Sequence, residues 1–108
     1  MTEMFLDFSQ KQFERCINTL KSKNSDYAGD RDPMSNFYLV ENAGVTSARK
    51  GVLVRMFDKM SRISTLIEGK EPSVADERIT DTLLDLINYS VILLFIIWRE
   101  NNNDPKSN

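Results

Sequence analysis

Residues 77–98, ERITDTLLDLINYSVILLFIIW, most constrain how this chain can fold. The stretch contains no proline or glycine and predicts one helix of about six turns. Glu77, Asp81 and Asp85 recur at intervals of four, which places their carboxylates on one helix face. Because like charges at this spacing destabilise an isolated helix, we expect a cation opposite them. A divalent metal ion and an arginine or lysine of a neighbouring helix are the candidates, and a solvated acidic face is the plain alternative.

The second half of this helix is apolar on every side. Residues 91–98 are all apolar, and a helix of that kind must be covered all round. Two further helices of a 108-residue chain can hardly do so, and we expect a homo-oligomer, a dimer or tetramer. The expected contacts are at or near Ile92, Phe95, Ile96 and Trp98. The run is too short to span a bilayer, so no membrane partner is expected.

Two more main helices are predicted, and no strand. Apolar residues at spacings of three and four predict a first helix that is capped by Asp7 or Ser9 and runs to about Lys23. The same spacing predicts a helix from about Ser47 to Ile67, with Gly44 breaking the chain before it.

Residues 21–37, KSKNSDYAGDRDPMSNF, predict a long loop, because Asn, Asp, Ser, Gly and Pro dominate them. Its aromatic residues favour a loop that folds back on the domain, and an ordered but inert loop is the alternative. The predicted fold class is all-α. It is one domain over residues 1–108, a small bundle of three main helices with a long ordered loop after the first and a polar tail from about residue 100.

Composition argues against several kinds of site and partner. The chain has no histidine and one cysteine, Cys16, so a zinc site and a histidine base are not expected. Carboxylate and amide oxygens would suit Mg²⁺ or Mn²⁺ instead. The formal net charge is −2 with no basic run, so no nucleic-acid partner is expected. One cysteine and an acidic start without a signal peptide favour a cytoplasmic protein.

A second charged stripe lies on the helix predicted over residues 47–67, and salt bridges on an exposed face are its plain alternative. A short turn joins the two helices, so they should be antiparallel with their charged stripes across one groove. The metal ligands would be Asp58, Glu77, Asp81 and Asp85. Lys23, Lys59 and Arg62 would neutralise the phosphate oxygens of a di- or triphosphate drawn to that metal.

Metal-assisted pyrophosphohydrolysis would follow from such a groove. Without histidine, a carboxylate must take the proton of the attacking water, and Glu77 or Asp58 is the candidate. Tyr27, Asn36 and Asn88 would bind the rest of the substrate, the ring by stacking and the amides by hydrogen bonds. Without a metal, the same residues would form an ion-pair network with no chemistry.

Three segments, KSKNSDYAGDRDPMSNF, GVLVRMFDKMSRISTLI and ERITDTLLDLINYSVILL, together resemble the small all-α "nucleotide modification associated" domain of phages and bacteria. That family is similar in turn to the MazG-like and dUTPase-like all-α NTP pyrophosphohydrolases. The most specific parts are Asp26-Tyr27, Asn36-Phe37, Arg55 with Asp58-Lys59 and Arg62, and Asp81-Thr82 with Asp85 and Asn88-Tyr89. The resemblance implies a helical bundle with acids that bind Mg²⁺, nucleotide substrates, and assembly into dimers or tetramers.

The chain departs from the wider superfamily at the acids. Its members carry an ExxE pair on one helix and an ExxD pair on the next, whereas here Asp58 is followed by Lys59 and the later acids are spaced by four. We therefore expect a Mg²⁺-dependent nucleotide pyrophosphohydrolase-like protein that acts on nucleoside di- or triphosphates. The alternative is a nucleotide-binding protein without catalysis, such as a phage sponge that sequesters a nucleotide signal of host immunity in the host cytoplasm.

Overall fold

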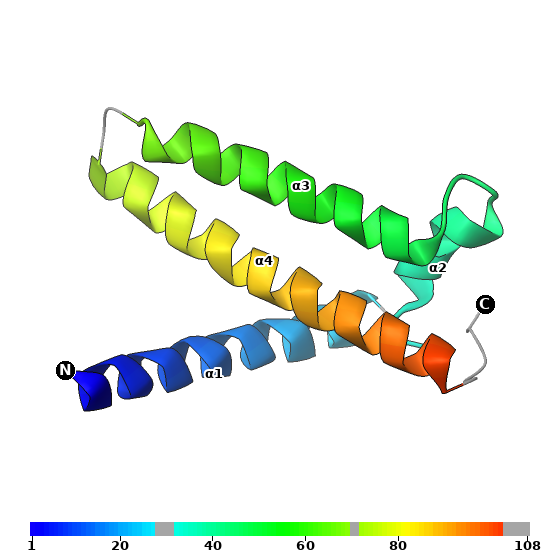
Figure 1. The fold of residues 1–108 in the computed structure, drawn as a ribbon, viewed down its shortest axis with the longest axis horizontal. Helices are drawn as coiled ribbons and strands as arrows, with labels where there is room; N and C mark the ends of the chain where they lie inside the picture. Colours follow the sequence, from blue (N-terminus) through cyan, green and yellow to red (C-terminus); the bar gives the residue numbers. More distant parts are fainter. Residues whose placement is uncertain (28–31, 70–71, 103–108) are drawn as a thin grey trace.

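Four α-helices make up the computed structural model, and the predicted all-α class is confirmed (Figure 1). The structure describes the backbone of residues 1–27, 32–69 and 72–102, and the side chains of residues 1–24, 32–69 and 78–102; no strand occurs among them. The helices are α1 (Thr2–Tyr27), α2 (Ser35–Asn42), α3 (Ala48–Ile67) and α4 (Pro72–Asn101).

Helix α4 is the centre of the arrangement. It packs along α3 as an antiparallel hairpin, as predicted, and α1 crosses it on another side (Figure 1). Figure 1 shows α1 diverging from α4 toward the N-terminus of the chain, while the short helix α2 lies beside the start of α3. The fold is therefore a closely packed hairpin of α3 and α4, and α1 packs against α4 where the two helices cross.

The core lies where α2, α3 and the second half of α4 meet. Its buried residues are Met34, Tyr38, Ala48, Val52 and Ile96. Ile96 is completely buried within the single chain, so it packs against residues of the same copy, and the prediction that it lies at or near a contact between copies stays a prediction. Phe95 and Trp98 of the same helix are exposed, and Ile92 is partly buried. In a run that is apolar on every side, only the packing of α2 and α3 decides which residue becomes core.

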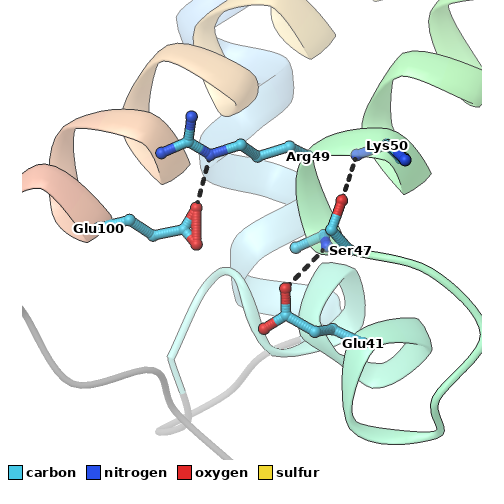
Figure 2. Close-up of polar contacts among 6 residues, drawn as sticks. Glu41, Ser47, Arg49, Lys50 and Glu100 are labelled. Carbon is cyan, nitrogen blue, oxygen red and sulfur yellow. Dashed lines mark hydrogen bonds and ion pairs between the residues drawn. The ribbon is translucent and has the colours of Figure 1, made fainter.

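Two side chains cap the start of α3, and an ion pair ties it to the end of α4 (Figure 2). Ser47 Oγ accepts a hydrogen bond from the Lys50 N–H at 3.1 Å, so the predicted serine cap is confirmed. Glu41 Oε1 accepts from the Ala48 N–H at 3.1 Å, and Arg49 Nε donates to Glu100 Oε1 at 2.8 Å.

Two glycines lie in or near the connection between α2 and α3. Gly44 has a φ of +76°, a left-handed conformation that stops α2 and that other residues adopt at a cost. Gly51 lies inside α3, where an added Cβ would come within 3.1 Å of Val40 Cγ2. The short helix α2 therefore packs closely against α3 at this glycine.

Helix α1 is longer than the sequence predicts at both ends. It begins at Thr2, and Ser9 Oγ donates to the Phe5 carbonyl oxygen at 2.7 Å inside the helix, so the predicted caps at Asp7 or Ser9 are wrong. The helix also runs past Lys23 to Tyr27, and α2 begins at Ser35. The connection between the two helices is therefore shorter than the loop predicted over residues 21–37. No glycine or proline interrupts the chain before Gly29, which allows the helix to continue. Residues 28–31 of the predicted loop lie outside the described residues.

The apolar stripe of α1 is only partly covered. Cys16 is buried against α4, whereas the exposed fraction is 56% for Phe13 and 51% for Ile17. Residues 78–101 of α4 are long and apolar enough to cross a membrane by length and composition alone, with 22% of the apolar window buried inside the chain. The core helix of a soluble protein passes the same test, and this stretch also carries Asp85 and Arg99, both engaged in ion pairs.

Candidate functional site

A cavity of about 750 Å³ opens where the C-terminal half of α1, the start of α2 and the middle of α4 meet. Aromatic and aliphatic side chains form most of its wall, among them Leu20, Phe37, Tyr89, Ile92 and Phe95. The polar residues at the wall are Lys21, Lys23, Asn24, Asp32, Ser35, Asn36, Arg55, Asp85 and Asn88. A mostly apolar cavity with a few polar groups is the usual form of a site for a small organic ligand.

A second cavity of about 280 Å³ adjoins the first. Its lining residues are Arg55, Asp58, Lys59, Arg62 and Tyr89. Four of them come from one stripe of α3, because they are three or four residues apart in a helix. Arg55 and Tyr89 line both cavities, so a ligand can extend from the apolar cavity into the cationic one.

Among the described side chains, the charged stripes of α3 and α4 meet at one ion pair. Lys59 Nζ lies 3.3 Å from Asp85 Oδ2, and both side chains are partly exposed. The predicted arrangement of facing stripes is therefore confirmed for this pair, and in this structure Lys59 is the cation opposite Asp85. A partly exposed pair of this kind contributes about 0–1 kcal/mol to stability.

A buried ion pair fixes the wall of the large cavity near α2. Arg99 at the end of α4 binds both carboxylate oxygens of Asp32, at 2.7 and 2.5 Å, and both side chains are about nine-tenths buried. Asp32 Oδ1 also accepts from the Met34 N–H at 2.8 Å, just before α2. The guanidinium lies 5.9 Å from the ring centre of Tyr38 and 5.5 Å from that of Phe95. This pair holds the start of α2 against α4.

Asn88 joins α4 to α1 at the floor of the large cavity. Its side chain is buried, and Nδ2 donates to the Cys16 carbonyl oxygen at 3.3 Å. Burial raises the pKa of the Cys16 thiol; the charge of Arg15 opposes the shift and that of Asp85 adds to it. The thiol is therefore protonated and serves as a small packing group.

The structure brings most of the predicted site residues to the two cavities. Lys23, Asn36, Asp85 and Asn88 line the large cavity. Asp58, Lys59 and Arg62 line the small one. Asp81 is exposed one turn before Asp85 and lines neither cavity. The side chains of Tyr27 and Glu77 lie outside the described residues, although the backbone of each is helical.

Two carboxylates, Asp58 and Asp85, border the cavities in positions where a metal ion could reach them. Within the described side chains, no group of three or more acids or cysteines comes close enough to hold a metal by itself. Mg²⁺ commonly uses one or two protein carboxylates together with substrate phosphates and water. This donor set therefore fits a metal ion that arrives with a phosphorylated ligand rather than an all-protein site.

Several wall residues were not predicted as site residues, among them Arg55, Phe37, Tyr89 and Asp32. The first three belong to the motifs of the family resemblance, but no role in a site was predicted for them. Arg55 is four residues before Lys59 and Tyr89 four after Asp85, so the same helical spacing could have identified both. Phe37 stacks under the Arg55 guanidinium at 4.9 Å from its ring centre. Asp32 gave no signal, because it lies in a predicted loop and its partner is far away in the chain.

Comparison with known proteins gives one match. No curated protein and no solved structure matches this chain. The family model described as Nucleotide modification associated domain 1 matches residues 43–97, just over half of the chain. These residues comprise all of α3 and most of α4, with Arg55, Asp58, Lys59, Arg62, Asp85, Asn88 and Tyr89 among them. The resemblance seen in the sequence is confirmed, and the chain belongs to the Nucleotide modification associated domain 1 family.

Proposed function

We propose that this chain binds a nucleotide, with the base in the large cavity and the phosphates in the small one. The observation that carries the proposal is the wall that the two cavities share at Arg55 and Tyr89. One side of that wall is mostly apolar and aromatic, as a base requires, and the other presents three cations. The family description, which refers to nucleotides, supports the same class of ligand.

The phosphates are assigned to Arg62, Arg55 and Lys59. Arginine binds phosphate oxygens in a bidentate manner, and lysine adds a compact charge. Lys59 exchanges its contact with Asp85 for the stronger negative charge of a polyphosphate. Lys23, at the wall of the large cavity, is a further phosphate contact, and Asn36, Asn88 and Tyr27 contact the base or sugar.

For the activity, the proposal is pyrophosphohydrolysis of a nucleoside di- or triphosphate with Mg²⁺ or Mn²⁺. Asp58 and Asp85 would hold the ion beside the phosphates, with Asp81 and Glu77 as further candidates. The bound ion would neutralise phosphate charge and lower the pKa of a water molecule. Asp58 or Glu77 would accept the proton of that water, since the chain has no histidine.

Binding without cleavage is the second candidate, and the Lys59–Asp85 pair favours it. A carboxylate already held 3.3 Å from an ammonium group is a weaker metal ligand than a free one. Such a protein would sequester its nucleotide, as a phage sponge for a nucleotide signal of host immunity does.

One experiment separates these candidates. The protein is incubated with a panel of nucleoside triphosphates and MgCl₂, and the products are separated. Monophosphate and pyrophosphate support the hydrolase, while tight binding of uncut nucleotide supports the sponge. Arg62→Ala should weaken binding in both cases, whereas Asp58→Asn and Glu77→Gln should stop turnover only in a hydrolase. Arg49→Ala, an exposed residue that lines neither cavity, is the control that should bind normally, and no binding to any nucleotide would sink both candidates.

We also propose that a second copy of the chain covers the apolar surface of α1 and α4, in a dimer or tetramer in the cytoplasm. The accessible surface is 7964 Å², roughly 1,800 Å² more than the value of about 6,200 Å² for a compact chain of 12.5 kDa. The radius of gyration, 16.1 Å, likewise exceeds the value of about 13 Å for this length. A standard interface buries about 800 Å² on each partner, so the excess is large enough for a stable assembly.

A further inference from the structure

One buried polar atom at the large cavity lacks a hydrogen-bond partner, and it is the Oδ1 atom of Asn88. The residue is 6% exposed and lines the cavity, yet no described group bonds to Oδ1. Buried polar groups in folded proteins are nearly always paired, so an orphaned side-chain oxygen at a cavity points to a ligand or a bound water.

The orientation of the amide is fixed by its other half. Nδ2 lies 3.3 Å from the Cys16 carbonyl oxygen, which can only accept a hydrogen bond. A flipped amide would place two acceptors against each other, so Oδ1 is the atom that remains without a partner. Asn88 therefore holds an unpaired acceptor within the wall of the cavity.

We propose that Asn88 Oδ1 accepts a hydrogen bond from an N–H of the nucleobase, which makes Asn88 a base-binding residue of the large cavity. This inference rests on the proposed nucleotide binding. A base edge suits the position better than a sugar does, because the neighbouring wall residues Leu20, Ile92 and Phe95 are apolar. A sugar would bring several hydroxyl groups into that surrounding, and each would need its own partner.

Matched ligands test the proposal without any change to the protein. Binding is measured for the four common ribonucleoside triphosphates, and the tightest is compared with an analogue that lacks the base N–H donor. The pair is ATP and purine riboside triphosphate, or UTP and N3-methyl-UTP. Loss of the donor should weaken binding by about 10- to 100-fold, because Oδ1 is again left unpaired in a filled cavity. The 2′-deoxy form of the tightest ligand, which lacks only a sugar hydroxyl, should lose much less.

The matched variants are Asn88→Leu, which has a similar size and no acceptor, and Asn24→Leu, which removes an exposed amide at the same cavity. Asn88→Leu should bind both members of the ligand pair within about twofold of each other, while Asn24→Leu should keep the discrimination of the wild type. If Asn88→Leu does not fold, the comparison of the two ligands on the wild-type protein still shows whether the base N–H contributes to binding.

Three results would overturn the inference. Wild-type protein that binds both members equally leaves nucleotide binding intact and shows that water, not the base, meets Oδ1. Equal discrimination by wild type and Asn88→Leu, or a large loss only with the 2′-deoxy form, assigns specificity to another contact. Absence of binding to every nucleotide instead defeats the proposed function and this inference together.

Discussion

The α3–α4 hairpin and helix α1 differ in how far their apolar residues are buried. In the hairpin, Val52, Ile63, Leu66 and Ile96 are buried, and the Arg49–Glu100 and Lys59–Asp85 pairs cross between the two helices. In α1, Cys16 is the one fully buried apolar residue among those described, whereas Phe5, Phe8, Phe13 and Ile17 are exposed. The hairpin and α2 therefore form the core together, and α1 carries apolar surface that the single chain does not use.

This difference coincides with the family match. Residues 43–97 comprise α3 and most of α4, whereas α1 and α2 precede the match. The cationic cavity lies entirely on the hairpin, while the large cavity also needs Leu20 and Lys23 of α1. We infer that the hairpin provides the phosphate site, and that α1 both closes the base site and offers a surface to a second copy.

The largest expected effect is on assembly. Phe13→Glu combined with Ile17→Glu places two charges on the exposed apolar stripe of α1, so the dimer or tetramer should become a monomer. Light scattering at micromolar concentration measures this change. Asn18→Glu, an exposed polar position on another face of α1, is the control and should leave the mass unchanged. A wild-type monomer would contradict the proposed assembly.

The next effect compares two ion pairs at the end of α4. Arg99→Met removes the guanidinium from the buried carboxylate of Asp32 and should lower the free energy of unfolding by about 3–5 kcal/mol. Arg49→Met breaks the more exposed pair with Glu100 and should cost about 0–1 kcal/mol. Urea unfolding at one fixed protein concentration gives both values. Equal losses would mean that the Asp32–Arg99 pair does not hold α2 in place.

These contrasts also explain which features of the structure could be predicted from the sequence. Residues close in the chain determine the hairpin: helical spacing of apolar residues, the Ser47 cap and the Gly44 break. The charged stripes at spacings of three and four then predict that the two helices face each other through charged residues, and the structure shows such a contact between Lys59 and Asp85. For these reasons the all-α class, the antiparallel pair of helices and most residues of the small cationic cavity could be predicted.

The remaining features depend on contacts between distant parts of the chain. Asp32 and Arg99 are far apart in sequence, and no local pattern links a loop aspartate to a helical arginine. The burial of Ile96 beside the exposed Phe95 cannot be predicted either, because both belong to a run that is apolar on every side. The large cavity arises only when α1 crosses α4, so its full lining could not be predicted.

A smaller effect separates core from surface within α3. Val52 is completely buried in the hairpin core, whereas 57% of Val54 is exposed. Val52→Ala should therefore lower the free energy of unfolding by about 2–3 kcal/mol, through lost burial and the cavity left behind. Val54→Ala makes the same chemical change and should stay within about 0.5 kcal/mol. Similar values for both, from urea unfolding, would show that Val52 is not part of a well-packed core.

The smallest expected effect concerns pH and the one buried thiol of α1. Burial raises the pKa of Cys16 in the folded chain, against the opposing charge of Arg15 and with the support of Asp85. Below the thiol pKa of the unfolded chain, about 8.5, both states hold the proton and the contribution to stability is fully present. As pH rises through the folded pKa that contribution is lost, because the unfolded chain gives up the proton first.

The difference in unfolding free energy between the wild type and Cys16→Ala isolates this thiol, since all other titrating groups are common to both proteins. The difference should be constant from pH 6 to about 8 and should shift against the wild type at higher pH. Native Cys16 should also react more slowly with iodoacetamide at pH 8 than the urea-unfolded chain does, because its thiolate is scarce and buried. Rapid alkylation of the native protein would mean that α1 often separates from α4 and exposes Cys16. The contact between α1 and α4 would then be less stable than the α3–α4 hairpin.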